Sequence, residues 1–333
     1  SDLKSRSIAA RTRRHALLSM LAATAIGLPG LAGAQSYPSK PIKMIIPAAP
    51  GGGTDVMGRT LARVMSEKNG IPVVVENRPG ASGSIGVQAV INAPADGYTI
   101  LMTLADATTI YPLLKKTPPY KVDRDLTPIA QVAFTHVLYA VSTASPYKSV
   151  QDLVAQSKGS KMAYGSNGFA TTSHLWIELF KQKTGADMLH VPYKGAAPAL
   201  QGLLSGEHSL VVASPATLKV QMDAGRVRPI AATSPKRLPA FPDVPTMVES
   251  GYADFVVGAW FGIFAPAKMS PAIADKLHDM IVTAMATPEY QKHAESFKFD
   301  TPQMPRADFA KLIAADAAVW RAAIEAAKIE PED

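Results

Sequence analysis

Cysteine is absent from this chain of 333 residues. Without thiols the chain has no disulfides, no thiolate metal sites, no thiol nucleophile and no cysteine to carry a lipid. Charged residues are also few, at 18%, whereas hydrophobic residues make up 47%. That balance is typical of a globular chain, and the length is enough for two domains with a core each.

Short catalytic motifs are missing as well. No Gly-x-Ser-x-Gly elbow occurs, and the glycine run at 51–53 is not followed by the Lys-Ser/Thr of a phosphate-binding loop. The six histidines after residue 34 show no metal-ligand spacing. We therefore expect no catalytic residues, no metal and no cofactor.

Residues 1–34 have the pattern of a signal peptide. A basic front is followed by an apolar run at 16–31 and by Ala32-Gly33-Ala34, a small-x-small site for cleavage after Ala34. We expect export to the periplasm, by the general or the twin-arginine route. The signal holds five basic residues and one acidic residue, which lowers the net charge from +7 to +3 for the remainder. No nucleic-acid partner is expected at that charge.

Apolar runs alternate with segments of helical periodicity after residue 40, which predicts an α/β fold with parallel strands. We predict strands at 42–46, 71–75, 98–103, 137–141, 161–164, 188–191, 209–213, 230–233 and 256–264. We predict helices at 55–68, 84–91, 150–157, 172–184, 196–205, 215–224, 272–286, 288–296 and 306–327. The strands at 137–141 and 256–264 are expected to cross between two lobes. Lobe 1 would then hold 35–137 and 264–333, and lobe 2 would hold 138–263.

Two loops are candidates for ligand binding: 47–55 (PAAPGGGTD) and 165–174 (GSNGFATTSH). Each follows a predicted strand and opens a predicted helix, with Thr54 and either Thr171 or Thr172 as expected N-caps. Free backbone N–H groups at a helix N-terminus attract anions, and glycine permits close approach. One loop from each lobe would grip a carboxylate without Arg or Lys. The alternative is that each loop is only a glycine-rich turn before a helix.

Five segments, in this order, resemble the tripartite tricarboxylate transporter substrate-binding proteins, also called Bug receptors. They are PGGGTD (50–55), ENRPGASG (76–83), ADGYT (95–99), HVPYKG (190–195) and FPDVPT (241–246). The similarity covers residues 37–331. It implies a type II periplasmic-binding fold that closes like a Venus flytrap. It also implies that residues 49–55 and 166–172 hold a ligand carboxylate, mostly through backbone groups and ordered waters.

The ligand-binding residues that we predict on this basis lie in the two loops and at the ends of neighbouring strands. They are Ala48, Ala49, Gly51, Gly52, Gly53, Thr54, Asp55, Ser82, Ala105, Ser166, Asn167, Phe169, Ala170, Thr171, Thr172, His174, Ala213 and Ser214.

The chain departs from the family pattern in ways that bear on the ligand. Ala48 stands where a bulky aromatic is common, Ala170 replaces a glycine, and no acid follows Ala213 to meet an ammonium group. We expect a non-amine ligand with an apolar body, an aromatic or aliphatic mono- or dicarboxylate. Phe169 and Trp260 are candidate stacking faces. The alternative for each, favoured for Trp260, is an ordinary cleft or core aromatic.

Three polar residues near these loops favour structural roles. Asp106 would repel a carboxylate, so we expect it to cap the next segment or to point away. Asp55 lies in the first helical turn, where an acid interacts favourably with the helix dipole. His174 is expected to orient its loop by a hydrogen bond.

The residues and the resemblance together predict a monomeric periplasmic receptor that delivers a small carboxylate to integral membrane transporter subunits. A receptor that signals to a membrane sensor kinase is compatible with the same site. An enzyme on the same two-lobed fold is a third reading, because fold alone does not exclude catalysis.

Overall fold

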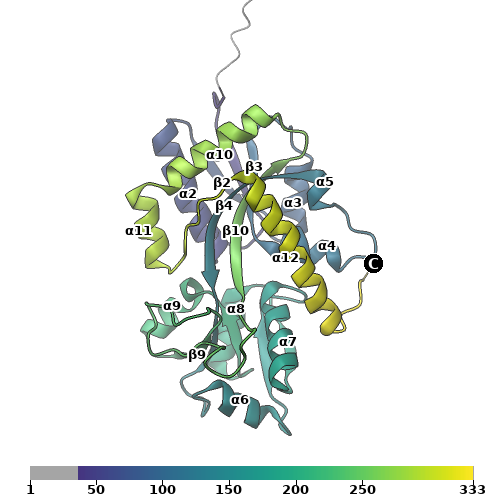
Figure 1. The fold of residues 1–333 in the computed structure, drawn as a ribbon, viewed down its shortest axis with the longest axis vertical. Coiled ribbons are helices and arrows are strands. Elements are labelled where there is room, and N and C mark those ends of the chain that lie inside the picture. The colour runs from purple at the N-terminus through teal and green to yellow at the C-terminus, as the bar shows by residue number, and fades with distance from the viewer. Residues whose placement is uncertain (1–36, 333) are drawn as a thin grey trace, which may run out of the picture. The chain divides into compact units, whose positions relative to one another are not determined.

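The computed structural model describes residues 37–332 of the chain. The predicted signal peptide and its cleavage site lie outside these residues. From Lys40 onward strands and helices alternate, as the sequence predicts (Figure 1). None of the helices described is both long and apolar enough to cross a membrane.

A five-stranded sheet has the order β2-β1-β3-β10-β4. β1 pairs in parallel with both β2 and β3, whereas β10 is antiparallel to β3 and β4. The strands are β1 (Ile42–Ile46), β2 (Val73–Asn77), β3 (Thr99–Thr103), β4 (Leu126–His136) and β10 (Gly258–Pro266). Its helical segments are α2 (Gly53–Asn69), η1 (Ala81–Gly83), α3 (Ser84–Ile91), the π-helical turn η2 (Asp106–Ile110), α4 (Tyr111–Leu113), α5 (Val122–Asp125), α10 (Pro271–Met285), α11 (Pro288–Ser296) and α12 (Arg306–Ala326).

The sequence prediction missed β4, which is the longest strand described. Pro128 interrupts its pattern, and a proline is tolerated there because β4 lies at the edge of the sheet. The chain also returns to this sheet at Gly258, where β10 begins, six residues before the predicted lobe boundary at residue 264.

The remaining strands form a three-stranded sheet, β8-β5-β9, and a parallel pair, β6-β7. Backbone hydrogen bonds from Gly165 to Leu210 (2.9 Å) and from Ser209 to Ala163 (2.8 Å) connect the pair to the sheet. These strands are β5 (Leu138–Ser142), β6 (Ala163–Ser166), β7 (Leu189–Pro192), β8 (Val211–Ala213) and β9 (Val227–Ala232). Their helices are α6 (Val150–Ser157), α7 (Thr172–Thr184), α8 (Ala196–Ser205) and α9 (Pro215–Asp223).

Two crossings join the two groups of strands, one at Val137 and one at Val257. Buried Thr233 ties them together, because its hydroxyl donates to the carbonyl of Val257 (2.8 Å) and accepts from the amide of Val137 (3.0 Å). The side chain of Thr233 therefore holds the two crossing segments together.

The hydrophobic core is continuous between the two groups of strands. In Figure 1, α12 extends along β10 toward α7. The rings of Trp320 on α12 and Trp176 on α7 lie 6.0 Å apart. Trp260 is 4% exposed, and its indole N–H donates to Asp316 on α12 (2.8 Å). Trp260 is therefore a core residue, as the second of its two readings had it, and not a stacking face for a ligand.

Candidate functional site

The loop between β1 and α2, residues 47–52, lies at the carboxyl edge of the parallel strands, where open α/β sheets bind ligands. The N-cap position of α2 is Gly52 and not Thr54, which lies buried in the first turn of the helix. Gly52 has no side chain to cap the helix. Within residues 37–332 the amides of Gly53, Thr54 and Asp55 donate to no acceptor. They form a site for an anion.

Asp55 holds this loop in shape. Its carboxylate accepts hydrogen bonds from the amide of Gly51 (3.0 Å), from Arg59 Nε (3.0 Å) and from Asn77 Nδ2 (2.9 Å). Asn77 also donates to the carbonyl of Ala48 (3.0 Å). Burial raises the pKa of Asp55, but the bonds from Arg59, Gly51 and Asn77 outweigh it and hold the pKa below its ordinary value. Both carboxylate oxygens of Asp55 accept hydrogen bonds within the protein, so Asp55 stabilises the conformation of the loop.

Two chain segments, around Gly83 and Ala107, lie beside this loop. A Cβ on Gly83, at the start of α3, would lie 3.2 Å from Pro47 and 2.8 Å from Ala107. Ala49 is exposed and Ala48 partly exposed, so their small side chains leave space next to the free amides. Ser82 is exposed on the same edge with a left-handed φ of 51°, and Ala105 is buried just after β3.

The second loop, between β6 and α7, is largely satisfied by its own side chains. The amide of Asn167 donates to Ser173 Oγ (2.9 Å), that of Gly168 to Ser166 Oγ (3.2 Å) and that of Ala170 to His174 Nδ1 (2.9 Å). Thr171 is the N-cap of α7 by position, but its hydroxyl donates to the carbonyl of Gly168 and caps no amide. We expected free amides in both loops. They occur at the start of α2 in the first loop, whereas most amides of the second loop are already bonded.

His174 orients the second loop, as its position suggested, and it does so together with His190, which the sequence analysis did not single out. The two imidazoles stack with centroids 3.8 Å apart and planes 6° apart. His190 Nε2 contacts Ser166 Oγ at 2.6 Å. Burial lowers the pKa of His174 to about 3, with smaller effects from His190 and Lys181, and burial lowers that of His190 to about 4. Both rings are neutral at pH 7.

Phe169 extends this aromatic stack outward. Its ring centroid lies 5.3 Å from that of His174, and the residue is 44% exposed. It is the outermost member of the stack in the second loop, and its exposed ring is accessible to a ligand.

Asp106 connects the two groups of strands at this site. One carboxylate oxygen accepts the backbone N–H of Thr172, the first residue of α7. Burial raises the pKa of Asp106 to about 6, against the effect of its hydrogen bonds from Thr172. The expectation that Asp106 would cap the segment after itself is wrong, because the helix that it caps is α7.

Ser214 brings the start of α9 close to the first loop. It is the N-cap of α9, where its hydroxyl accepts from the amide of Thr217 (3.3 Å). A Cβ on Gly53 would lie 3.7 Å from Ser214 Oγ, so the first loop and the start of α9 are neighbours. Ala213 directly precedes it at the end of β8.

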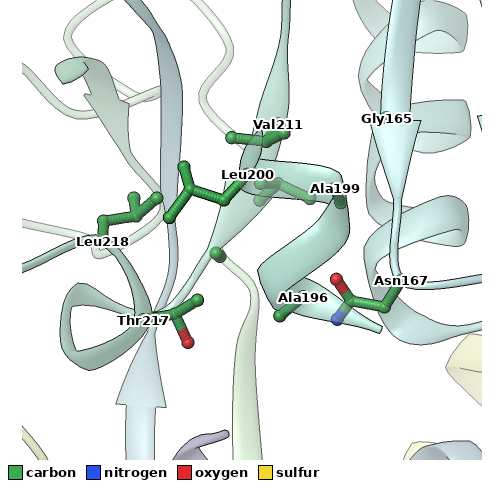
Figure 2. A pocket seen from close by; sticks show the side chains of 10 residues that line it. Gly165, Asn167, Ala196, Ala199, Leu200, Val211, Thr217 and Leu218 are labelled. Carbon is green, nitrogen blue, oxygen red and sulfur yellow. The ribbon is translucent and has the colours of Figure 1, made fainter. Parts of the chain in front are cut away.

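A small cavity of about 10 Å³, room for a single water, lies between α8, α9 and the ends of β6 and β8. In Figure 2 the side chain of Asn167 points toward Ala196 at the start of α8, and Thr217 lies on the opposite side. Most of the lining is apolar: Ala196, Ala199, Leu200, Val211, Val212, Ala213 and Leu218. The cavity is therefore bordered by Asn167 of the second loop on one side and by apolar side chains on the others.

Comparison with known proteins gives a consistent result. The family model described as tripartite tricarboxylate transporter family receptor matches residues 57–329. The Bordetella pertussis protein BugT is 38% identical over 277 residues, which cover 82% of this chain and 85% of BugT.

Solved structures agree with these sequence matches. They include the periplasmic binding protein BugD (32% identical, TM-score 0.82), an R. palustris protein with adipate (30%, 0.84) and the Rhodopseudomonas palustris protein MatC with bound malate (26%, 0.81). The matches cover 89%, 89% and 86% of this chain and 100% of each of the other three. The predicted two-lobed periplasmic-binding fold is confirmed.

Proposed function

Since this chain belongs to the tripartite tricarboxylate transporter receptor family, we propose that it captures a small carboxylate between its lobes and delivers it to the membrane subunits of such a transporter. Members of this family are periplasmic solute-binding receptors. Adipate and malate, both carboxylates, occupy two of the similar structures.

The uncapped start of α2 is the observation that carries this proposal. Gly53, Thr54 and Asp55 direct unpaired amides from a helix N-terminus, where the helix dipole adds partial positive charge. Asp55 and Asn77 hold the loop in place, so the amides are ordered before a ligand arrives. Such preorganisation reduces the entropy cost of binding.

We propose that the body of the ligand lies toward Asn167, Phe169 and Ser214. The exposed ring of Phe169 favours aliphatic or aromatic carbon over further charge. A non-amine mono- or dicarboxylate fits the absence of an acid after Ala213.

Closure of the two lobes is the step that we expect a membrane partner to recognise. We propose that the boundary between the lobes lies near Val137 and Val257. Residues 40–137 and 258–332 would form one lobe, and residues 138–257 would form the other. A ligand that contacts both lobes favours the closed form. We further propose that residues 1–34 direct export to the periplasm and are cleaved after Ala34, and that the receptor is monomeric and non-catalytic.

A pair of substitutions at Gly52 tests the proposed function. The N-cap has φ −79° and ψ 169°, which any residue adopts, and a Cβ there would have no neighbour within 4 Å. Gly52→Asp supplies an internal carboxylate to the free amides. We expect unchanged or slightly higher stability, by up to ~0.5 kcal/mol, and at least tenfold weaker ligand binding. Gly52→Asn is the uncharged control and should lose less affinity.

The ligand for this test comes from a thermal-shift screen of aromatic and aliphatic carboxylates, followed by calorimetry. A screen without any stabilising carboxylate would contradict the proposed function. So would a Gly52→Asp variant that binds the selected ligand as tightly as the wild type. Tight binding of glutamate or aspartate would contradict the non-amine assignment alone.

A further inference from the structure

Asp106 places a negative charge inside the proposed site. It is the first residue of the π-helical turn that follows β3, and the neighbouring Ala107 packs toward Gly83 and Pro47 at the base of the first loop. Its carboxylate accepts the amide of Thr172 at the start of α7. The side chain therefore lies where the two binding loops come together.

The carboxylate of Asp106 therefore already supplies a negative charge at the N-terminus of α7. The amides of Asn167, Gly168 and Ala170 are bonded within their own loop, and the amide of Thr172 is bonded to Asp106. A ligand carboxylate at this end would find few donors and would face the charge of Asp106. Like charges at close range in a partly buried site repel strongly.

The same carboxylate can accept a donor from the ligand. A carboxylate has about four acceptor positions, and among residues 37–332 Asp106 accepts hydrogen bonds from Thr172 alone. Asp106 also remains partly exposed. A hydroxyl at the far end of a ligand would therefore satisfy Asp106, while the carboxylate of the ligand occupies the start of α2.

We propose that Asp106 makes this receptor select monocarboxylates whose far end carries a hydroxyl group, in preference to dicarboxylates. This inference rests on the proposed function and specifies its ligand class. The alternative is that Asp106 swings away from Thr172 when a second carboxylate arrives, in which case the residue would not discriminate between the two classes.

Matched ligand pairs test the inference. Succinate and 4-hydroxybutyrate, adipate and 6-hydroxyhexanoate, and suberate and 8-hydroxyoctanoate differ only in the far group. Calorimetry on the wild type should show at least a tenfold preference for the hydroxy acid of the pair that binds best. Asp106→Asn should reduce this preference to within threefold or reverse it. Asp123→Asn, which removes an exposed charge on α5, should keep the wild-type preference.

Asp106→Ser serves as a second variant if Asp106→Asn folds poorly, because a serine hydroxyl still accepts a hydrogen bond. An equal ratio in the wild type and the Asp106 variants, or a wild-type preference for the dicarboxylate, would overturn the inference and leave the carboxylate receptor intact. If none of these acids binds and the wider carboxylate screen is also negative, the proposed function fails, and the inference with it.

Discussion

Acidification should destabilise the protein through the stacked pair of His174 and His190. His174 is 4% exposed and has a pKa of about 3 in the fold, against 6.5 in an unfolded chain. The folded state therefore binds a proton less tightly than the unfolded state. Above pH 6.5 His174 is neutral in both states and the free energy of unfolding is undiminished. As the pH falls from 6.5 toward 3, the unfolded state takes up the proton first, and the free energy of unfolding decreases progressively.

The size of the effect follows from proton linkage. Each pH unit below 6.5 costs about 1.4 kcal/mol per histidine, so His174 alone should lose about 2 kcal/mol between pH 7 and pH 5. His190, with a pKa of about 4, changes stability in the same direction. Asp106 works in the opposite direction, because its raised pKa of about 6 lets the folded state take up a proton in this range. The wild-type pH dependence alone therefore does not isolate His174.

His174→Asn separates these contributions. The Asn Oδ1 can still accept the amide of Ala170, but the side chain no longer titrates. Urea unfolding followed by circular dichroism at pH 7 and pH 5 gives the change in unfolding free energy for both proteins. We expect the wild type to lose about 2 kcal/mol more than the variant. Equal losses would refute the assignment of a buried neutral imidazole to His174.

Two further substitutions test the loops. Ala170 has a left-handed φ of +58°, so Ala170→Gly should raise the free energy of unfolding by roughly 0.5 kcal/mol. The control Ala322→Gly, on the exposed face of α12, should lower it by about 1 kcal/mol. A lower free energy of unfolding for Ala170→Gly would contradict backbone strain at residue 170. Asp55→Asn should cost about 1–3 kcal/mol at pH 7. Because the pKa of Asp55 is lowered by folding, its contribution is present above about pH 4 and disappears as the pH falls through the folded pKa, so the difference between wild type and variant should shrink in acid unfolding titrations.

Local pattern was enough to predict most helices, most strands and the place of both loops. A strand followed by PGGGTD and a periodic helix specifies a turn with few conformational alternatives, and α2 begins there. The prediction of Thr54 as N-cap was wrong because three successive glycines leave the starting residue of the helix open. β4 was missed because its tolerance of Pro128 depends on its edge position, which is a property of the whole sheet.

The sequence by itself determined the α/β alternation, the two glycine-containing loops and the family resemblance, because each depends on residues that are close together along the chain. Tertiary structure alone decided that Asp106 caps α7, 66 residues further on, and that His190 stacks on His174. It also decided that Trp260 is held in the core by Asp316. These contacts depend on how separate segments pack, and spacing in the sequence carries no record of that packing.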